Sequence, residues 1–308
     1  MADDGGVARI ALTGATGFVG SHLQTSLLAR GYAVRALVRA GSPNVSRLAA
    51  DTECFQAELH EQTRIAAAME GVTAAIYCAG SVRGRSPGDF ASANVRGVAN
   101  VAAACAAHGV PLLLMSSLAA SRPEVSDYAA SKRAGEQALQ DVPGLQWTVF
   151  RPPAIYGPGD QEMLPLLKLM RAGIQPRLGP AGQRISLLNV KDLAAAVVSW
   201  LDHRAVCAGQ TYSLDDGFPG GYDWPAMTAE LAGRSTVQVP VPRALLAGVA
   251  AINRTLSGLF GYAPMLTPGK VRELWQQEWL CDNGAFFIAT GWQPTVPLAA
   301  GAQELFGG

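Results

Sequence analysis

The chain has 308 residues and an apolar content of 49%, enough for one large domain and a smaller lobe around well-buried cores. Its 24 basic and 24 acidic residues give a formal net charge of zero, which argues against a nucleic-acid-binding surface. No stretch reaches the roughly 18 apolar residues that a membrane span requires. The first six residues lack the basic and apolar regions of a signal peptide.

The cysteines and histidines show no metal-site spacing. The five cysteines are an odd number scattered along the chain without a Cys-x-x-Cys pair, and the four histidines are equally dispersed. Free, buried thiols of this kind are typical of a reducing compartment. We therefore expect a cytoplasmic protein without a bound metal ion.

The first predicted strand runs directly into a glycine-rich turn. Arg9–Leu12 is a short apolar run typical of a buried parallel strand, and residues 21–30 carry leucines at helical spacing. Between them lies the pattern Gly14-x-x-Gly17-x-x-Gly20. Glycines in this context allow a tight turn and let backbone N–H groups approach a pyrophosphate at the positive end of a helix. The segment predicts a dinucleotide-binding turn; the alternative is a purely structural turn.

The second predicted strand, Ala33–Val38, is followed by basic rather than acidic residues. A pocket for NAD usually places Asp or Glu about twenty residues after the glycines, where the carboxylate binds the ribose. This chain has Arg35, Arg39 and Arg47 in that region instead. A guanidinium suits the extra phosphate of NADP, and Arg39 is the best placed because it follows the strand end. NADP(H) is therefore favoured and NAD(H) stays possible, unless these arginines only face solvent.

A later strand and helix carry groups suited to proton transfer. Residues 112–117 form an apolar run that ends in two serines, and Tyr128 and Lys132 open a helix at positions i and i+4 of one face. A nearby ammonium favours the phenolate and lowers the tyrosine pKa from about 10 by about 1–3 pH units. Tyr128 is then expected to exchange a proton near neutral pH. Ser117 is expected to hydrogen-bond the substrate oxygen, and Lys132 to reach the nicotinamide ribose.

Together these segments resemble an extended short-chain dehydrogenase/reductase of the NAD(P)-dependent epimerase/dehydratase group, including its 3β-hydroxysteroid dehydrogenase-like branch. The resemblance covers nearly the whole chain and includes residues 77–80, 94–97, 116–120, 151–160, 188–192 and 291–294. It implies an α/β fold with a Rossmann-type doubly wound parallel sheet and a smaller C-terminal substrate lobe. The NADP(H)-binding domain is expected over residues 7–150. Residues 151–308 are expected to form mainly the substrate-binding lobe, with elements that return to the first domain.

The resemblance also implies individual site residues. The catalytic triad is expected to be Ser117, Tyr128 and Lys132. The cofactor is expected to contact Gly14, Thr16, Gly17, Phe18, Val19, Arg39, Glu58, Leu59, Ala79, Gly80, Tyr128, Lys132, Pro153 and Ile155. The substrate is expected to contact Ser81, Arg83, Tyr156 and Arg184. Arg184 can equally pair with Asp192 for a structural reason. The loop from Ser117 to Tyr128 is shorter than in many extended members, which suggests a more open site or an altered substrate.

These residues predict an oxidoreductase that transfers hydride between NADP(H) and a carbonyl or secondary alcohol. An apolar or lipid-like substrate is favoured if the cleft is lined by Met163, Leu164, Leu167, Leu259, Phe260 and Trp275. One alternative is an NAD(P)-dependent nucleotide-sugar epimerase or dehydratase. The other is a non-catalytic NADP(H)-binding sensor or assembly subunit, a class that usually loses the tyrosine or the lysine.

Two further expectations concern surfaces. Arg243–Phe260 is predicted to be an amphipathic helix over the substrate cleft, where core packing or a lid is expected rather than peripheral membrane contact. The helices expected at about 89–108 and 127–140 carry small and apolar residues on more than one face. The resemblance implies that they pair across a two-fold axis, so a homodimer is expected.

Overall fold

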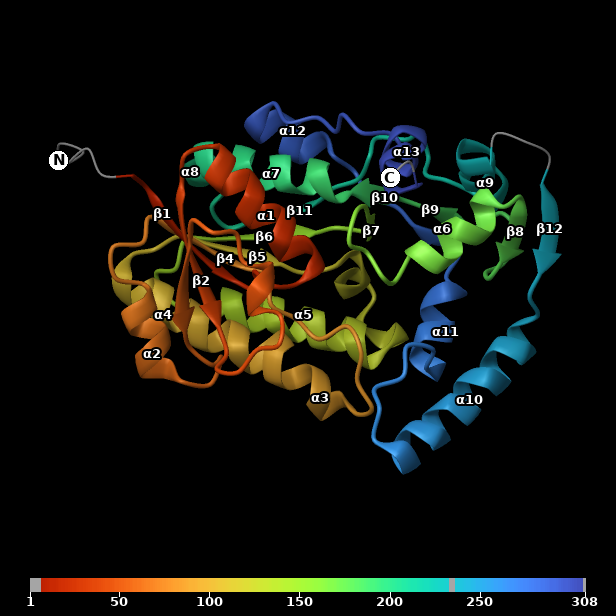
Figure 1. Ribbon diagram of the computed structural model, residues 1–308, viewed down its shortest axis with the longest axis horizontal. Coiled ribbons are helices and arrows are strands. Elements are labelled where there is room, and N and C mark those ends of the chain that lie inside the picture. Colours follow the sequence, from red (N-terminus) through yellow and green to blue (C-terminus); the bar gives the residue numbers. More distant parts are fainter. Residues whose placement is uncertain (1–6, 233–235, 307–308) are drawn as a thin grey trace.

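A parallel sheet of seven strands forms the centre of the fold. The computed structural model describes residues 7–232 and 236–306 (Figure 1). The strands of the sheet are β1 Arg9–Thr13, β2 Ala33–Val38, β3 Thr52–Gln56, β4 Ala74–Tyr77, β5 Leu112–Met115, β6 Trp147–Arg151 and β11 Gln210–Ser213. Their order from one edge to the other is β11-β6-β5-β4-β1-β2-β3. The order reverses beside β1, which is where a ligand crevice opens in such sheets.

Helices cover both faces of this sheet. One face carries α1 Phe18–Ala29, α7 Val190–Asp202, α8 Arg204–Cys207 and α12 Gly284–Thr290 (Figure 1). The other carries α2 Gln62–Ala68, α3 Pro87–Ala91, α4 Val98–His108 and α5 Asp127–Gln140, with a π-helical turn over Ser92–Gly97 between α3 and α4. Short 3₁₀ turns lie at Val45–Arg47, Leu118–Ser121 and Pro123–Val125. The predicted doubly wound α/β fold is confirmed.

The apolar residues of β1 divide between two cores. Ile10 and Leu12 belong to the core on the α1 and α7 side, whereas Ala11 belongs to the core on the α4 side. All three are at most 2% exposed. A strand that is buried on both faces has a continuous apolar run instead of an alternating one. This is the physical reason that Arg9–Leu12 predicts a parallel strand.

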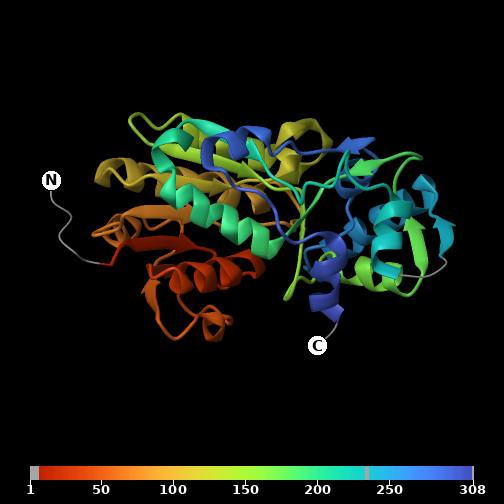
Figure 2. The same ribbon diagram turned by 90° about the horizontal axis from the view of Figure 1, so that it is seen from above.

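The lobe extends from the carboxyl end of the sheet and consists of short elements (Figure 2). Its helices are α6 Leu164–Arg171, α9 Trp224–Ala232, α10 Arg243–Phe260, α11 Pro268–Leu274 and α13 Leu298–Phe306. Its strands are β7 Ala154–Tyr156, β8 Ile174–Arg177, β9 Arg184–Ile185, β10 Leu187–Asn189, β12 Val237–Pro240 and β13 Glu278–Trp279. They pair in parallel as β7 with β10, β8 with β12 and β9 with β13.

Several segments after residue 151 return to the sheet. β11 pairs with β6, α7 packs against α1, and Phe286 and Trp292 join the core on that face. The C-terminal half of the chain therefore contributes to both the sheet and the lobe. The division at residues 150 and 151 stays a prediction.

No helix in the described part of the chain is long and apolar enough to cross a membrane. The first six residues, for which no signal peptide is expected, lie outside the described residues.

Candidate active site

The glycine-rich turn lies at the carboxyl end of β1, at the point where the strand order reverses. Gly14 has a φ of +72°, and a Cβ there would lie 2.7 Å from the backbone of Cys78 and Ala79. A Cβ on Gly20 would lie 2.0 Å from the carbonyl oxygen of Gly14. The Thr13 hydroxyl accepts hydrogen bonds from the amides of Cys78 and Ala79 at 3.2 and 3.1 Å. Only glycine therefore fits at position 14, where the turn approaches the end of β4, and at position 20, where α1 approaches the turn.

The start of α1 leaves backbone donors available beside this turn. Gly17 is the N-cap residue, and no side chain caps the helix. The amides of a first helical turn have no acceptor within their own helix. Gly17 is exposed, and Thr16, Phe18 and Val19 are half-buried around it. A helix N-terminus with free amides and no side chain in the way fits the pyrophosphate of a dinucleotide.

The three arginines after the start of β2 have different environments. Arg35 belongs to the scaffold, because it donates to Glu53 at 2.9 Å and to two backbone carbonyls after α2. Arg39 is exposed at the end of β2, and its guanidinium makes no hydrogen bond or ion pair within the described residues, although its carbonyl accepts from the amide of Ser42. Arg47 is also exposed. Arg39 therefore fits a phosphate on the ribose better than Arg35 does.

Glu58 and Leu59 follow β3 at the same edge of the sheet. The amide of Glu58 donates to the Glu61 carboxylate at 2.7 Å, and the carbonyl of Leu59 accepts from Asn100 at 2.8 Å. Both residues are half-buried, as are Pro153 and Ile155 near β7. Their backbone is fixed, so their positions depend little on a ligand.

The end of β4 adjoins the predicted catalytic helix α5. A Cβ on Gly80 would lie 3.2 Å from both Lys132 Nζ and Asn94 Oδ1. Asn94 binds the backbone of Ser81 through two hydrogen bonds of 2.9 Å and donates a third to Ser131 on α5. Asn94 therefore holds α5 against the β4 loop. Gly80 leaves the space beside the lysine open.

The predicted triad comes together at the carboxyl edge of the sheet. Ser126 caps α5 by accepting from the amide of Ala129 at 3.0 Å, so the helix begins just before Tyr128. Lys132, one turn later, donates to the carbonyl of Met115 at the end of β5 at 3.1 Å. Ser117 follows β5, and its hydroxyl accepts from Ala119 at 3.2 Å. The i and i+4 spacing thus directs both side chains of α5 towards the end of β5.

The pKa of Tyr128 differs from the sequence-based prediction. Burial raises it to about 12, the neighbouring Ser117 hydroxyl opposes this, and the Glu273 carboxylate adds to it. The predicted lowering by Lys132 is wrong for this structure, because burial dominates and the ammonium is directed to a backbone carbonyl. Burial also lowers the pKa of Lys132 to about 8, although Cys78 and Glu136 raise it.

Glu136 is a buried residue of this region that the sequence analysis did not identify. It lies one further turn along α5 and is fully buried. It accepts from Ser116 at 2.6 Å and from Arg151 at 2.8 and 2.5 Å. Such donors satisfy the hydrogen-bonding capacity of a buried carboxylate. The spacing of 128, 132 and 136 on one face was the signal that could have identified it.

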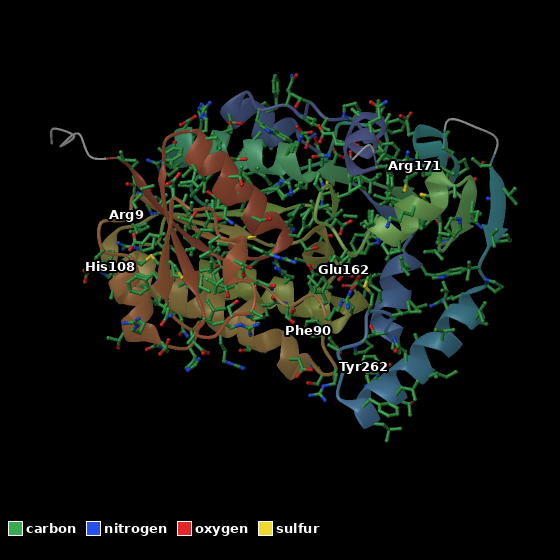
Figure 3. All side chains as sticks on the ribbon, in the orientation of Figure 1. Arg9, Phe90, His108, Glu162, Arg171 and Tyr262 are labelled. Atoms are coloured by element: carbon green, nitrogen blue, oxygen red, sulfur yellow. The ribbon has the colours of Figure 1, made fainter. Side chains whose placement is uncertain are left out.

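The residues predicted to contact substrate are mostly engaged within the chain. Arg83 forms a charge-assisted pair with Glu162 at 2.6 Å. Glu162 is labelled in Figure 3, where the lobe adjoins the sheet domain. Arg184 lies 3.9 Å from Asp223 and donates to a backbone carbonyl. Tyr156 is fully buried in the lobe core, a position that does not favour substrate contact. The Ser81 hydroxyl donates to the carbonyl of Arg83 at 2.8 Å.

The structural alternative for Arg184 is wrong. Asp192 does not pair with it; its carboxylate accepts from the amides of Thr295 and Val296 and from the Thr295 hydroxyl, at 2.9 to 3.0 Å. A buried carboxylate is stabilised by hydrogen bonds from neighbouring N–H and O–H groups. Here these groups belong to a C-terminal segment that passes the start of α7. Asp192 thus anchors the C-terminal segment.

Helix α11 of the lobe holds the loop that leads into α5. Glu273 is buried and accepts from Ser126, the residue that caps α5. Arg272 donates to the carbonyl of Val125 at 2.8 Å. The Arg122 guanidinium lies 5.2 Å from the centre of the Trp279 ring. The short loop before Tyr128 is therefore bordered directly by the lobe.

Apolar side chains surround Tyr128. The Phe90 ring packs edge-on at 6.2 Å, and a small cluster of Ala119, Val125 and Ala129 includes Trp279 from the lobe. The apolar lobe residues named from the sequence do not form one lining. Leu167 is buried in the lobe core, whereas Leu259 and Phe260 are exposed on α10. The apolar wall near Tyr128 therefore comes from other residues than those expected.

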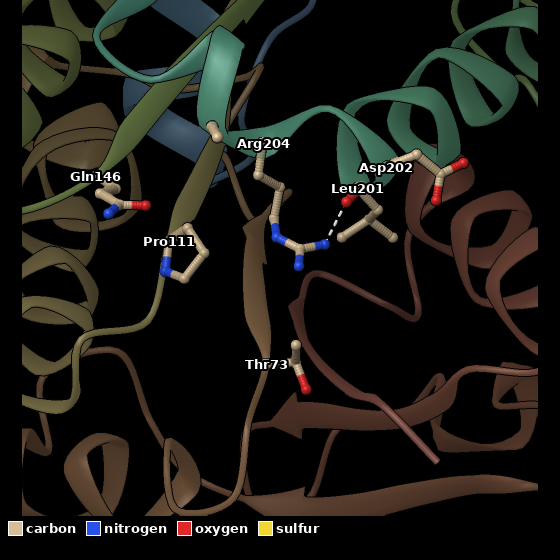
Figure 4. A pocket seen from close by; sticks show the side chains of 7 residues that line it. Thr73, Pro111, Gln146, Leu201, Asp202 and Arg204 are labelled. Carbon is tan, nitrogen blue, oxygen red and sulfur yellow. Dashed lines mark hydrogen bonds between the residues drawn. The ribbon is translucent and has the colours of Figure 1, made fainter. Parts of the chain in front are cut away.

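A surface hollow on the opposite edge of the sheet is separate from this region (Figure 4). It is lined by the residues that precede β4, β5 and β6, by the end of α7 and by the start of α8, namely Thr73, Pro111, Gln146, Leu201, Asp202, Arg204 and Ala205. Ligands of such sheets bind at the carboxyl ends of the strands, so this hollow is at the wrong edge. In residues 7–232 and 236–306 no group of three metal-ligating side chains comes together.

Comparison with known proteins finds relatives over almost the full length. The sequence profile described as the NAD dependent epimerase/dehydratase family matches residues 10–214. A ceramide reductase of Caulobacter vibrioides is 34% identical over 307 residues, covering 97% of this chain and 90% of that protein. A 2-alkyl-3-oxoalkanoate reductase of Stenotrophomonas maltophilia is 32% identical over 244 residues, covering 68% and 71%. The structure of a Thermus thermophilus UDP-glucose 4-epimerase complex with NAD has a TM-score of 0.70 at 20% identity, covering 97% and 99%.

Proposed function

Because the chain belongs to the NAD dependent epimerase/dehydratase family of extended short-chain dehydrogenases/reductases, we propose that it reduces the ketone of an apolar, lipid-like substrate with NADPH. It is an NAD(P)-dependent enzyme whose relatives include reductases, steroid dehydrogenases and epimerases. The names of the two relatives above 30% identity support reduction of a lipid-like carbonyl. The alternative of a non-catalytic sensor is not favoured, because Ser117, Tyr128 and Lys132 are all retained.

The proposed chemistry assigns one task to each residue of the triad. The bound nicotinamide supplies the hydride for the carbonyl carbon. Tyr128, whose pKa is raised to about 12, keeps its proton at neutral pH and gives it to the carbonyl oxygen. Ser117 donates a hydrogen bond to the same oxygen. Lys132 binds the ribose hydroxyls, and the phenolate that remains on Tyr128 takes up a proton from water. A tyrosine that holds its proton suits reduction better than alcohol oxidation at neutral pH.

One observation carries the choice of an apolar substrate over a nucleotide sugar. Both cations among the expected substrate-contact residues, Arg83 and Arg184, already face carboxylates of this chain. A sugar diphosphate would have to displace Glu162 or Asp223 to reach them. Tyr128, in contrast, is bordered by Phe90 and Trp279. Apolar walls beside Tyr128, with Arg83 and Arg184 engaged by carboxylates, favour a ketone on a hydrocarbon chain.

A substrate panel tests this proposal. Purified enzyme with NADPH is offered a ketone of the oxidised-ceramide type, a 2-alkyl-3-oxoalkanoate and UDP-glucose, and products are identified by mass spectrometry and NMR. We expect NADPH consumption with a lipid ketone and no conversion of the sugar. Tyr128→Phe should lower turnover by about 10²–10⁴-fold while NADPH still binds. Sugar epimerisation without ketone reduction would establish the nucleotide-sugar alternative instead.

The preference for NADPH over NADH is tested separately. The Arg39 guanidinium has no partner within the described residues, and Arg39 follows β2, where the ribose phosphate of NADP would lie. Loss of one charge-assisted contact costs about 1.5–3 kcal/mol, so Arg39→Asp should weaken NADPH binding by at least about tenfold and spare NADH. Fluorescence titration measures both constants. Arg47→Asp is the matched control, and equal binding of both cofactors by the wild type would exclude the preference.

A further inference from the structure

Glu136 connects the three elements that converge on the candidate active site. It lies on α5 two turns after Tyr128 and one turn after Lys132, and its side chain is fully buried. Ser116, which follows β5, donates to it at 2.6 Å. Arg151, the last residue of β6, donates to both of its oxygens, at 2.8 and 2.5 Å. One carboxylate thus holds the helix of the proton donor to the ends of two neighbouring strands.

The bond to Ser116 fixes groups on both sides of that serine. The carbonyl of Met115 precedes it and accepts from Lys132 at 3.1 Å. Ser117 follows it, and the Ser117 hydroxyl lies beside that of Tyr128. Because peptide units are planar and rigid, a change in the position of Ser116 moves both neighbours. Glu136 therefore fixes the serine of the triad and the acceptor of the lysine to the helix that carries Tyr128.

The bond to Arg151 fixes the segment that follows β6. Arg151 leads directly into Pro152 and Pro153, and the carbonyl of Pro152 accepts from the amide of Leu118 at 2.8 Å. This segment leaves the carboxyl edge of the sheet, where ligands of such folds bind, and Pro153 is among the residues expected to contact the cofactor. A charge-assisted pair with two parallel bonds fixes orientation as well as distance. Glu136 therefore also fixes the cofactor side of the site.

Stability alone does not account for this cluster. A buried ion pair is often no more stabilising than apolar side chains of the same size, because both charges lose their hydration. Glu136 nevertheless has two guanidinium partners, since Arg133 also lies 3.2 Å from it. Charge-assisted bonds have defined directions, whereas apolar contacts tolerate small shifts. The cluster is therefore suited to fixing the geometry of the elements that it joins.

We propose that Glu136 is a positioning residue, which aligns the proton donor Tyr128 with the nicotinamide side of the site. It acts through Ser116 and Arg151 and, being fully buried, touches neither substrate nor cofactor. This role rests on the proposed function, in which one carbonyl receives a proton from Tyr128 and a hydride from the cofactor. Both donors must be in place together, and a displacement of about 1 Å can lower the rate by about 10²-fold.

Single-turnover kinetics of two variants test this role, with whichever compound of the substrate panel the wild type converts. Glu136→Gln keeps the shape and removes the charge, and the rate of the chemical step should fall at least about tenfold. The half-saturating substrate concentration and the Kd of NADPH should stay within roughly twofold of the wild type, because the glycine-rich turn is unchanged. Ser116→Ala removes a single hydroxyl and should lower the same rate with a smaller effect on folding.

A buried carboxylate elsewhere in the chain provides the matched control. Asp192 on α7 also accepts three hydrogen bonds from a distant segment. Asp192→Asn should lower the Tm as Glu136→Gln does, but it should leave the rate unchanged. The paired variant Glu136→Leu/Arg151→Met removes both charges, so its Tm should recover because no buried charge is left without its partner. Its rate should stay low, because the bonds that align the site are still missing.

Hydrogen exchange gives a readout that needs no substrate. Glu136→Gln should speed amide exchange in the peptides over 115–119 and 151–156, whereas Asp192→Asn should not. A normal rate in Glu136→Gln or Ser116→Ala, or a rate that recovers together with the Tm in the paired variant, overturns the proposal. If the wild type converts no compound of the panel, the proposed function fails, and unchanged exchange in these peptides would then overturn the positioning role separately.

Discussion

At the scale of single residues, burial of the Lys132 ammonium lowers the free energy of unfolding. Its pKa of about 8 lies below the ordinary value of 10.5, since burial disfavours the charged form. The unfolded chain therefore holds this proton more tightly, and the free energy of unfolding rises as pH increases from about 8 to about 10.5. Below about pH 8, burial of the ammonium lowers the free energy of unfolding by its full amount, on the order of 3 kcal/mol.

The free energy of unfolding of a variant without this ammonium tests whether Lys132 is buried as a charged group. Lys132→Met removes the buried charge and keeps an unbranched chain of similar length. We expect it to raise the free energy of unfolding by about 1–3 kcal/mol at pH 7 in urea titrations, with the gain shrinking as pH rises from about 8 to about 10.5. Turnover should fall at the same time. Lys168→Met, on the exposed side of α6, is the control and should change stability little. A Lys132→Met protein that is less stable at pH 7 would contradict the argument.

At the scale of elements, the contact between α11 and α5 connects the lobe to the proposed proton donor. Glu273 accepts from Ser126 and from Lys270, and its charge raises the pKa of Tyr128. Glu273→Gln keeps the shape but removes the charge. The pKa of Tyr128 should then fall, so the rise of alcohol oxidation with pH should begin at lower pH than in the wild type.

The pH–rate profile of the oxidation direction measures this effect. The exposed Glu230→Gln on α9 is the control and should leave the profile unchanged. Loss of the charged acceptor should also lower the free energy of unfolding by about 1–3 kcal/mol. If Glu273→Gln lowers the free energy of unfolding but leaves the pH–rate profile unchanged, Glu273 stabilises the fold without affecting Tyr128.

At the scale of the whole molecule, the predicted homodimer has a surface that suits it. α4 and α5 lie side by side on one face of the sheet, and small side chains are exposed on both, namely Ala103, Ala107, Ala130 and Ala134. Small residues let two such helix pairs approach closely across a two-fold axis. Sedimentation equilibrium at micromolar concentration should therefore show a dimer.

Ala134→Glu should convert this dimer to a monomer, because it places two like charges near each other in the interface. A monomeric wild type would rule out the expected homodimer.

Much of the fold was predictable from local sequence. The apolar run Arg9–Leu12, the glycines of the first turn and the i, i+4 pair of Tyr128 and Lys132 act over a few residues. Their physical consequences, a buried strand, a close backbone approach and a shared helix face, follow without knowledge of distant contacts. For this reason the doubly wound sheet, the cofactor class and the neighbourhood of Ser117 with α5 could be derived from the sequence.

Burial and pairing between distant segments were decided only by the tertiary structure. The raised pKa of Tyr128 depends on the walls that Phe90 and the lobe build around it. The engagement of Arg83 by Glu162 joins residues far apart in the chain. The periodicity of α10 predicts an amphipathic helix but cannot tell whether its apolar side meets a core, because that depends on what the rest of the chain packs against it. Desolvation and long-range charge pairing belong to the assembled fold, so no local pattern determines them.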